Sequence, residues 1–593
     1  MTLLLLLACG DKDSSPEPPE DTGTPTNDSP ADSPADSPVD SVDTSPPVDT
    51  GPFDADGDGV FDKDDCAPDD PDVHGGAPDE DLDGVDQNCD GVDGTDVDQD
   101  GYAATWTGGT DCDDTNPAVH LGAASEEPEL CTVDADEDGY GSDTVGAGVD
   151  AGSDCDDDDE HVSPWHGEWR DGKDNDCDGA IDEDFGEADA LSKLSWGSGT
   201  GLLGYAMTLV DDLDGDGVPE IAIAAEKQGG AALYTGAMVG DIDVSTGMTL
   251  TADTSMLPGR SMASGELTAD GVPDLIVAVP RYWDSTGQFR GGAFVVSGDS
   301  TGSLALSDAD ALLQGNGFDA ILGYGAAAVD LDGDGQEDLA SGSSMVTASE
   351  GSILVALGPL TTTVDHDDAD ATLKPDTDGS VNWAVLTSTD HDGDGLDELV
   401  VGAPYDKSYD GAVYVIPHGA SGTAYLTDVA TLVVRGETTG PRYPGLSLAG
   451  GDDVDGDGLD DLAFGGHSDA WLVWGNTTGE LETTDMPVHI DGDDQLGASV
   501  ALGDFNADGL VDLAVGAPDA DPGEVRIYLN GATGTVDAEA DADRVIVGRD
   551  EDSAFGWAMV GGVDLSGDSL ADLLIGAPYA DSQAGYAWLL EGP

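Results

Sequence analysis

Residues 496–518 read LGASVALGDFNADGLVDLAVGAP. The first apolar segment, 496–500, leads through an acidic loop into a second, 513–518, which ends in Gly-Ala-Pro. An alternating segment at 524–528 and another at 545–548 complete the unit. Because short apolar segments bounded by Gly, Asn and Asp are typical of β-strands, the unit predicts four short strands.

The same unit occurs seven times. Its acidic loops begin at Asp212, Glu266, Asp330, Asp390, Asp453, Asp504 and Asp564, at intervals of 54, 64, 60, 63, 51 and 60 residues. Four strands form one blade of a β-propeller. The repeats therefore predict an all-β fold, a seven-bladed β-propeller over residues 186–593.

The two ends of the repeat region predict how the ring closes. The last repeat stops after its third strand, 584–590, and a strand-like segment, 190–196, stands before the first repeat. We expect 190–196 to be the fourth strand of the last blade, because this pairing hides both sheet edges.

The acidic loops have the spacing of a cation site. In the loop from Asp453 to Asp461, alternate carboxylates point inward, Gly458 permits a sharp turn, and the carbonyl of Leu459 adds a ligand. Hard oxygen ligands in this number suit Ca²⁺ better than Mg²⁺. An EF-hand would carry Glu at position twelve, where this sequence has Phe464, so a β-hairpin loop is predicted.

The loops differ in their ligands. Those beginning at Asp212, Asp330, Asp390 and Asp453 are complete, and the one at Asp504 substitutes an amide, Asn506. Ser566 and Ser569 interrupt the loop at Asp564, and for Glu266, Thr268, Asp270 and Asp274 a turn without metal is at least as well supported. The predicted propeller ligands are Asp212, Asp214, Asp216, Val218, Glu220, Asp330, Asp332, Asp334, Gln336, Asp338, Asp390, Asp392, Asp394, Leu396, Glu398, Asp453, Asp455, Asp457, Leu459, Asp461, Asp504, Asn506, Asp508, Leu510, Asp512, Asp564, Asp568 and Asp572.

The repeats resemble the FG-GAP repeat of the integrin α N-terminal propeller. The resemblance is nearly literal in Phe555-Gly556 with Gly576-Ala577-Pro578, and in Gly402-Ala403-Pro404. It implies calcium in the loops between the first two strands of several blades, on one face of the disc. It also implies that ligands dock on the opposite face.

Three shorter acidic units fill residues 53–185, each reaching a Cys beside further carboxylates. They resemble the metal-binding motif repeats of bacterial surface proteins and, more loosely, thrombospondin type 3 repeats. Ala104 and Ser142 occupy position nine of the second and third loops, where the first has Asp62. The predicted ligands are Asp54, Asp56, Asp58, Val60, Asp62, Asp96, Asp98, Asp100, Asp134, Asp136, Asp138, Asp174, Asp176, Asp178 and Asp182.

Six of the seven cysteines fall in these units. Their spacings suggest three sequential disulfides, Cys66 with Cys89, Cys112 with Cys131, and Cys155 with Cys177. Six cysteines allow 15 pairings, so the connectivity stays open at this point. A thiolate metal site is the weaker reading, because the CxxC spacing of zinc sites is absent. We expect an irregular, disulfide- and calcium-rich stalk in an oxidising compartment.

The N-terminus predicts export. Leu6-Leu7-Ala8-Cys9 resembles the bacterial lipobox, in which Cys9 is lipidated, and residues 1–9 would be the remnant of a lipoprotein signal. Residues 10–52 form a Ser-, Pro- and Asp-rich tract that cannot bury a core, so they predict a disordered tether. The location expected is the bacterial outer membrane, cell surface or extracellular space.

The negative net charge of the chain disfavours some classes of binding partner. The formal net charge of −111 repels nucleic acid, and a membrane contact is expected only through a lipid anchor. A disordered acidic chain or a halophile surface would scatter its carboxylates, whereas many here stand at fixed offsets.

Three functions remain open. We favour an adhesion or ligand-binding module for a protein or glycan at the cell surface. The alternatives are a polysaccharide hydrolase or lyase and a scaffold that stores calcium. HExxH does not occur, and the GxSxG spacing at residues 298–302 lies within a repeat of short strands, where the strand–turn–helix of a nucleophile elbow is not expected; both observations disfavour an enzyme. Exposed aromatics such as Tyr282, Trp283, Tyr405 and Tyr409 could form a docking face, although packing between blades is the more common role of such residues.

Overall fold

The chain divides between Glu160 and His161 into two compact units. The computed structural model describes residues 54–590 apart from 64, 76, 80–83, 90, 126, 137, 147–148, 160–161, 165–172, 178, 180–184, 187–189, 198–200, 214–217, 236–237, 239, 253–255, 257, 285, 318–320, 345–350, 377–378, 438–441, 549–552 and 567–570. The predicted lipid site at Cys9, the tether 10–52 and the predicted ligands Asp178, Asp182, Asp214, Asp216 and Asp568 lie outside the described residues.

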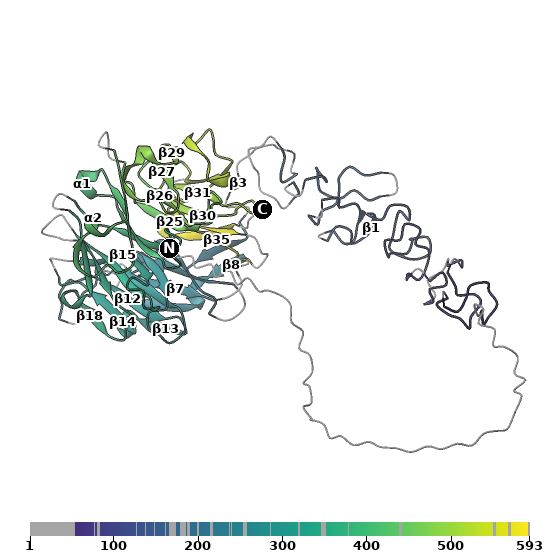
Figure 1. Ribbon diagram of the computed structural model, residues 1–593, viewed down its shortest axis with the longest axis horizontal. Helices are drawn as coiled ribbons and strands as arrows, with labels where there is room; N and C mark the ends of the chain where they lie inside the picture. Colours follow the sequence, from purple (N-terminus) through teal and green to yellow (C-terminus); the bar gives the residue numbers. More distant parts are fainter. Residues whose placement is uncertain are drawn as a thin grey trace, which may run out of the picture. The chain divides into compact units, whose positions relative to one another are not determined.

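The C-terminal unit is a seven-bladed β-propeller (Figure 1). Blade 1 contains β5 (Leu203–Val210), β6 (Glu220–Ala225), β7 (Gly230–Tyr234), β9 (Met248–Thr251) and β13 (Ser303–Ala305). Blade 2 contains β10 (Met262–Gly265), β11 (Asp274–Val279), β12 (Gly292–Ser297), β14 (Ala311–Gln314) and β18 (Thr363–Asp365). Blade 3 contains β15 (Ile321–Val329), β16 (Asp338–Ser344), β17 (Ser352–Ala356), β19 (Ala371–Lys374) and β23 (Gly422–Tyr425). Blades 4 and 5 contain β20 (Val385–Thr389), β21 (Glu398–Ala403), β22 (Ala412–Ile416), β24 (Leu432–Arg435) and β28 (Gly479–Glu482); and β25 (Ser447–Asp452), β26 (Asp461–Gly465), β27 (Asp469–Val473), β29 (Val488–Asp491) and β33 (Gly534–Asp537). Blades 6 and 7 contain β30 (Ser499–Gly503), β31 (Asp512–Ala517), β32 (Glu524–Tyr528), β34 (Arg544–Val547) and β3 (Phe185–Gly186); and β35 (Ala558–Val563), β36 (Asp572–Ala577), β37 (Tyr586–Leu590), β4 (Ser192–Ser195) and β8 (Gly240–Asp243).

Short helical turns connect some of the strands. They are η1 (Glu226–Gln228), η2 (Val244–Thr246), η3 (Leu306–Asp308), η4 (His366–Asp368), η5 (Thr483–Asp485), η6 (Leu529–Gly531), α1 (Asp406–Tyr409), α2 (Leu426–Val429) and α3 (Ala580–Gln583). Among the described residues, no helix has the length and apolar character that a bilayer crossing requires.

The hydrophobic core is divided among the junctions between blades. Seven clusters of buried apolar side chains each draw on two neighbouring blades, so every sheet is covered on both faces. In the cluster between blades 6 and 7, for example, Ile527 packs with Phe555 and Trp588. The first strands of the blades also contact one another in sequence around the ring, from β5 through to β35 and back to β5.

Glycine pairs bring neighbouring blades into close contact. A Cβ on Gly516, in the Gly-Ala-Pro segment of blade 6, would lie 2.1 Å from the carbonyl oxygen of Gly556 in blade 7. A Cβ on Gly402 would likewise lie 2.4 Å from the carbonyl oxygen of Gly445. Gly445 and Gly556 have φ of +88° and +83°, a conformation that L side chains rarely adopt. The Phe-Gly and Gly-Ala-Pro motifs therefore meet across a blade junction.

The ring closes through β4, a strand that precedes the first blade in the sequence, as predicted. β4 pairs antiparallel with β37, joining Leu194 to Ala587, and it is the fourth strand of blade 7. Its observed bounds, Ser192–Ser195, lie inside the predicted segment 190–196. In Figure 1, β8 from the early part of the unit and β35 from its end belong to the same blade, where they form its two edges.

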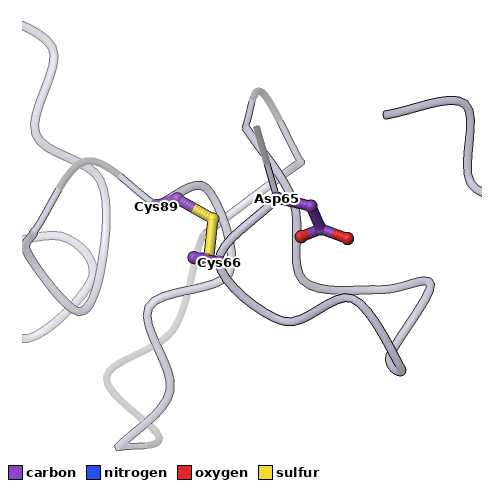
Figure 2. A group of neighbouring side chains, drawn as sticks. All are labelled: Asp65, Cys66 and Cys89. Carbon is purple, nitrogen blue, oxygen red and sulfur yellow. A yellow bond between two sulfur atoms is a disulfide. The ribbon is translucent and has the colours of Figure 1, made fainter. Parts of the chain in front are cut away.

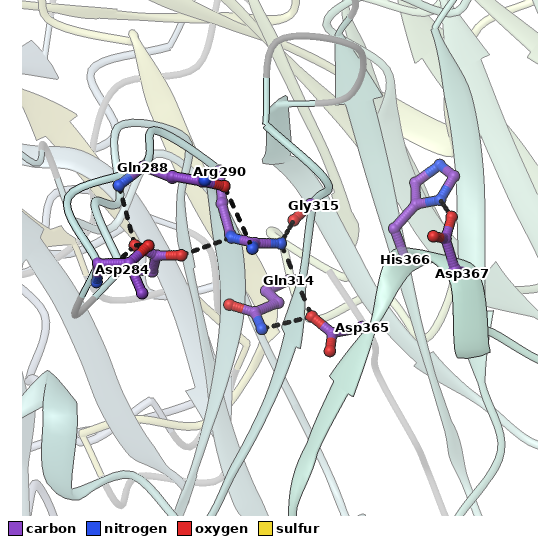
Figure 3. Close-up of polar contacts among 9 residues, drawn as sticks. Asp284, Gln288, Arg290, Gln314, Gly315, Asp365, His366 and Asp367 are labelled. Carbon is purple, nitrogen blue, oxygen red and sulfur yellow. Dashed lines mark hydrogen bonds and ion pairs between the residues drawn. The ribbon is translucent and has the colours of Figure 1, made fainter.

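Each blade also has a fifth strand, which the sequence reasoning missed. A short segment between the third and fourth strands of a blade pairs in parallel with the fourth strand of the preceding blade, as β18 does with β14. Figure 3 shows this contact, where Gln314 Nε2 donates to Asp365 Oδ1 at 2.6 Å. Arg290 lies between Asp365 and Asp284, 3.8 and 2.6 Å from their carboxylates. We call these fifth strands strap strands; they are β13, β18, β23, β28, β33, β3 and β8. They link neighbouring blades by hydrogen bonds, in addition to the packing of apolar side chains between the sheets.

One predicted strand boundary was wrong. The segment 496–500 was expected to be extended throughout, but β30 begins only at Ser499. The N–H of Ala498 donates to the carbonyl of Gln495 in a turn, and Gly497 has φ of +86°. The turn allows Gly497 to approach Gly465 of blade 5.

The N-terminal unit consists mainly of loops. Its described strands are β1 (His120–Leu121) and β2 (Cys131–Thr132), which pair antiparallel. The Cys66–Cys89 and Cys112–Cys131 disulfides form as predicted. Cys155 of this unit is also disulfide-bonded, as is Cys177, which follows the division at residue 160. Figure 2 shows Asp65 next to the first of these bridges.

We expect Gly516→Ala to destabilise the propeller by about 1–3 kcal/mol, because the added methyl group meets backbone that cannot rotate away. Gly342→Ala is the matched control: it lies in the second strand of blade 3, where a Cβ has its nearest contact at 3.3 Å, the side chain of Ala384. Thermal unfolding of both variants measures the difference. An equal cost at the two positions would contradict the role of the glycine pairs.

Candidate metal-binding loops and ligand cavity

The acidic loops lie between the first and second strands of the blades and fold around their own carboxylates. In blade 5, Asp453 accepts hydrogen bonds from the N–H groups of Asp457 (3.0 Å) and Gly458 (2.7 Å). Asp461 begins β26 and accepts one from the N–H of Val454 at 2.8 Å. The acid at position nine therefore ties the start of the loop to the second strand.

This framework recurs around the ring. The acid at position one accepts from the N–H at position six in Asp330 with Gly335 (2.8 Å), Asp390 with Gly395 (2.9 Å) and Asp504 with Gly509 (2.8 Å). The acid at position nine accepts from the N–H at position two in Glu220 with Leu213 (2.8 Å), Asp338 with Leu331 (3.0 Å), Glu398 with His391 (3.0 Å) and Asp512 with Phe505 (2.9 Å). These hydrogen bonds fold each loop back on itself, so that its predicted ligands come close to one another in space.

The loops with weaker ligand sets keep the contact made by the acid at position nine. In blade 2, Asp274 accepts from the N–H of Leu267 at 2.8 Å, and in blade 7, Asp572 accepts from the N–H of Leu565 at 2.6 Å. In blade 6, the Asn506 amide oxygen accepts from the N–H of Asp508 at 3.2 Å, taking the place of a carboxylate. The hydrogen bond between the acid at position nine and the N–H at position two therefore forms whether or not the acidic set is complete.

The acids at position nine are buried, unlike the loop tips. Burial raises the pKa of Asp338 and Asp461 to about 6, of Asp512 to about 7 and of Glu398 to about 8. Neighbouring carboxylates, such as Asp392 beside Glu398, raise the pKa further. A bound divalent cation would offset both the desolvation and the repulsion.

The loops of the N-terminal unit have the same local geometry. In the first, Asp54 accepts from the N–H of Gly57 at 2.7 Å, and Asp62 accepts from that of Ala55 at 2.8 Å. Asp54, Asp56 and Asp58 each offer a carboxylate oxygen within 4.8 Å of the others. These predicted ligands converge on one point.

In the second and third repeats, which lack an acid at position nine, an acid that follows the Cys accepts the hydrogen bond from position two instead. Asp114 accepts from the N–H of Val97 at 2.7 Å, and Asp157 accepts from that of Ala135 at 2.9 Å. These are the contacts that Asp62 makes in the first repeat, whereas Ala104 and Ser142 occupy position nine. The sequence signal was the acidic run around each Cys, which the prediction did not assign to the loops.

Two further acids next to the cysteines face the same loops. Asp111 and Asp154 are fully buried, and Oδ2 of each has no hydrogen-bond partner among the described residues. Burial raises the pKa of Asp111 to about 6 and of Asp154 to about 7, and acids of the loops raise it further. A buried carboxylate oxygen without a donor suits a metal ligand.

A cavity of about 540 Å³ opens at the other end of the propeller's first strands. Its lining includes residues at the starts of those strands, such as Met262, Val385 and Ser499, whereas the acidic loops follow the ends of the same strands. The cavity and the acidic loops therefore lie toward opposite faces of the ring.

Aromatic side chains from separate blades line this cavity. Tyr324 stacks on Trp383 with ring centroids 5.6 Å apart, and Tyr405 contacts both Trp383 (5.7 Å) and Tyr443 (5.7 Å). Trp383 is 46 % exposed, so part of this aromatic surface is open to solvent. Of the aromatic residues singled out from the sequence, Tyr405 lines the cavity, and Tyr409 contacts the ring of Tyr405. Tyr282 and Trp283 pack against phenylalanines away from the cavity.

The lining of the cavity is unusual for so acidic a chain. None of its described residues is Asp or Glu, although the chain has 127 of them, and one, Arg260, is cationic. The guanidinium of Arg260 donates to the hydroxyl of Tyr205 at 2.5 Å and lies 5.9 Å from the centroid of Trp383. Nearby, burial raises the pKa of Glu226 against the opposing effects of Arg260 and Arg281. The cavity is therefore a local exception to the negative surface.

We predict that, in chelator, the propeller becomes more stable as the pH falls from about 8 to 5. The pKa of Asp512 and of Glu398 is raised in the folded protein, so protonation favours folding, and stability is lost as the pH rises through these values. Calorimetric melting temperatures across this range check the sign. Asp512→Asn should reduce the slope, and a melting temperature that falls on acidification would contradict the prediction.

Comparison with known proteins identifies both repeat types. A family model described as "FG-GAP repeat" matches residues 381–416, 496–536 and 555–590, and one described as "FG-GAP-like repeat" matches 453–515. The family "Putative metal-binding motif" matches 65–94, 111–138 and 154–183.

The similar curated proteins include integrin α chains. Integrin alpha-PS2 of Drosophila melanogaster is 31 % identical over 229 residues, which cover 34 % of this chain and 16 % of that one. Integrin alpha pat-2 of Caenorhabditis elegans is 29 % identical over 35 % of this chain and 18 % of its own, and integrin alpha-7 of Mus musculus is 35 % identical over 37 % and 19 %. The chain thus spans under a fifth of the length of these relatives.

A solved structure, that of the Vibrio cholerae biofilm matrix protein Bap1, aligns over 57 % of this chain and 41 % of its own, with 14 % identity and a TM-score of 0.23. The family matches and the integrin relatives agree with the geometry of the blades and loops. The chain therefore contains an FG-GAP propeller similar to that of integrin α chains, preceded by repeats of a metal-binding motif.

Proposed function

We propose that this protein is a calcium-stabilised adhesion module of the bacterial cell surface, whose propeller cavity binds an anionic glycan. The proposal includes the four segments expected from the sequence: the signal remnant 1–9, the tether 10–52, the metal-binding repeats 53–185 and the propeller 186–593. Cys9 would attach the chain to the outer membrane through lipid.

Calcium is supported by the ligand chemistry of the loops. Their side-chain donors are mainly carboxylate oxygens, with one amide in the loop of Asn506, and such all-oxygen sets suit Ca²⁺. Several acids in both units are buried, where a cation would compensate their charge. The ion would act mainly on stability, because extracellular calcium modules typically bind in the range of about 0.1–1 mM.

The absence of acids from the described lining of the cavity is the observation that carries the ligand proposal. Exposed aromatic faces such as that of Trp383 suit the apolar C–H faces of sugar rings. Arg260 can pair with a carboxylate or sulfate on the same ligand. A cationic peptide would instead need acids in the cavity, so an acidic glycan fits better.

The catalytic alternative finds little support in the same cavity. Glycoside hydrolysis usually relies on two carboxylic acids on either side of the bond. The described residues that line the cavity provide none, although His467 and several tyrosines are present. Binding without turnover is therefore the function that this geometry favours.

We expect calorimetry to show heat on Ca²⁺ addition and a rise in melting temperature. At a calcium concentration of one hundred times Kd, each site that exists only in the folded state adds about 2.7 kcal/mol. Asp457→Asn should weaken one site, whereas Asp241→Asn, at an exposed position of β8, should leave the titration unchanged. No heat and no stabilisation would contradict the calcium proposal.

The ligand proposal is tested on an array of neutral and anionic glycans and acidic and basic peptides. We expect calcium-loaded full chain to bind uronic acid or sulfated glycans, and Trp383→Ala or Arg260→Ala to lose at least about tenfold in affinity, or 1.4 kcal/mol. Trp283→Ala, an exposed tryptophan outside the cavity, is the matched control. Preference for basic peptides, or cleavage of a bound glycan, would overturn the proposal.

A further inference from the structure

The acidic loop of blade 4 differs from its neighbours at the second oxygen of the acid at position nine. In three other blades that oxygen accepts a backbone hydrogen bond from the residue two positions after the third strand. The pairs are Gly358 with Asp338 Oδ1 (2.8 Å), Gly475 with Asp461 Oδ1 (2.7 Å) and Asn530 with Asp512 Oδ1 (2.8 Å). Both carboxylate oxygens are thus bound by the backbone in those loops.

In blade 4 the acid is Glu398 and the residue two positions after β22 is His418. Oε2 of Glu398 accepts from the N–H groups of His391 (3.0 Å) and Asp392 (3.3 Å). Oε1 is buried and has no hydrogen-bond partner among the described residues, although Glu398 is only 1 % exposed. A buried carboxylate oxygen without a donor requires a compensating group.

The imidazole of His418 lies beside this oxygen-rich site. His418, Asp394 and Glu398 each offer a ligand atom within 4.8 Å of the other two, and His418 Nδ1 lies 3.7 Å from Asp394 Oδ2. The three residues come from the loop, from the start of β21 and from the turn after β22. The fold of blade 4 thus brings one imidazole and two carboxylates together from three separate segments.

A simple ion pair explains only part of this arrangement. An exposed contact between His418 and Asp394 would contribute little to stability, and it leaves Glu398 Oε1 without a partner. A second His-containing cluster, Asp469, His489 and Asp491, shows the contrast. There Arg442 contacts both aspartates and supplies the positive charge.

We propose that the blade 4 loop is a mixed nitrogen and oxygen site for a first-row divalent transition ion, with His418, Asp394 and Glu398 among its ligands. Imidazole nitrogen favours such ions over Ca²⁺, which takes oxygen ligands. The inference rests on the proposed function only in requiring that the loops bind metal. It gives one blade a selectivity that the all-oxygen loops lack.

Pulsed EPR of Mn²⁺ bound to the full chain tests this directly. Mn²⁺ can replace Ca²⁺ in oxygen loops, but the strong ¹⁴N coupling of a nitrogen bound directly to the ion requires an imidazole ligand. We expect ¹⁴N coupling in the wild-type chain and its loss in His418→Gly, which places there the residue found in blades 3 and 5. His366→Gly is the matched control, because His366 also pairs with an aspartate, Asp367, at 3.2 Å (Figure 3).

Competition with Zn²⁺ tests the selectivity. We expect Zn²⁺ to displace the nitrogen-coupled Mn²⁺ at a concentration about tenfold lower in the wild-type chain than in a Glu398→Gln variant, because that variant weakens the site. Calorimetry in Ca²⁺ confirms that each variant is folded. Mn²⁺ that binds without ¹⁴N coupling would overturn this inference and leave calcium loops intact, whereas no Mn²⁺ binding at all would count against both proposals.

Discussion

The close approach of glycine backbones between neighbouring blades is the constraint on which the propeller depends. At four junctions, a glycine just before or at the start of the first strand of one blade meets a glycine in the second strand of the blade before it, as Gly556 meets Gly516. Because glycine has no side chain, the backbones of neighbouring blades lie in direct contact at these positions. The first strands of the blades begin around the cavity and end at the acidic loops. The spacing of the ring thus positions both candidate sites.

The acidic loops combine two tasks that conflict in the absence of a cation. Their carboxylates accept backbone N–H groups and so define the hairpin, but they also repel one another within a chain of net charge −111. The conflict is sharpest at the buried acids, such as Asp512 and Glu398, where burial raises the pKa. The cavity avoids the conflict, because its described lining contains no acid.

Much of the fold could be predicted because its signals are local and repeated. The seven loops fixed the number of blades, and the unmatched segment 190–196 predicted the closure by β4. The strap strands could not be predicted in this way, since β18 is three residues long and mostly exposed. Asp114 and Asp157 were missed because they reach their loops from beyond position nine. Tyr405 was singled out from the sequence, but Tyr324, Trp383 and Tyr443 were missed because these side chains come together only in the folded ring.

The closure by β4 also has a consequence for biogenesis. Residues 192–195 emerge from the ribosome, and cross a membrane in an N-terminus-first export route, long before their partner strand at 586–590. Until that strand arrives, β4 has an open hydrogen-bonding edge and β37 does not yet exist. The last blade can therefore assemble only after nearly the whole polypeptide has been delivered, and a chain truncated before residue 586 leaves the circle open.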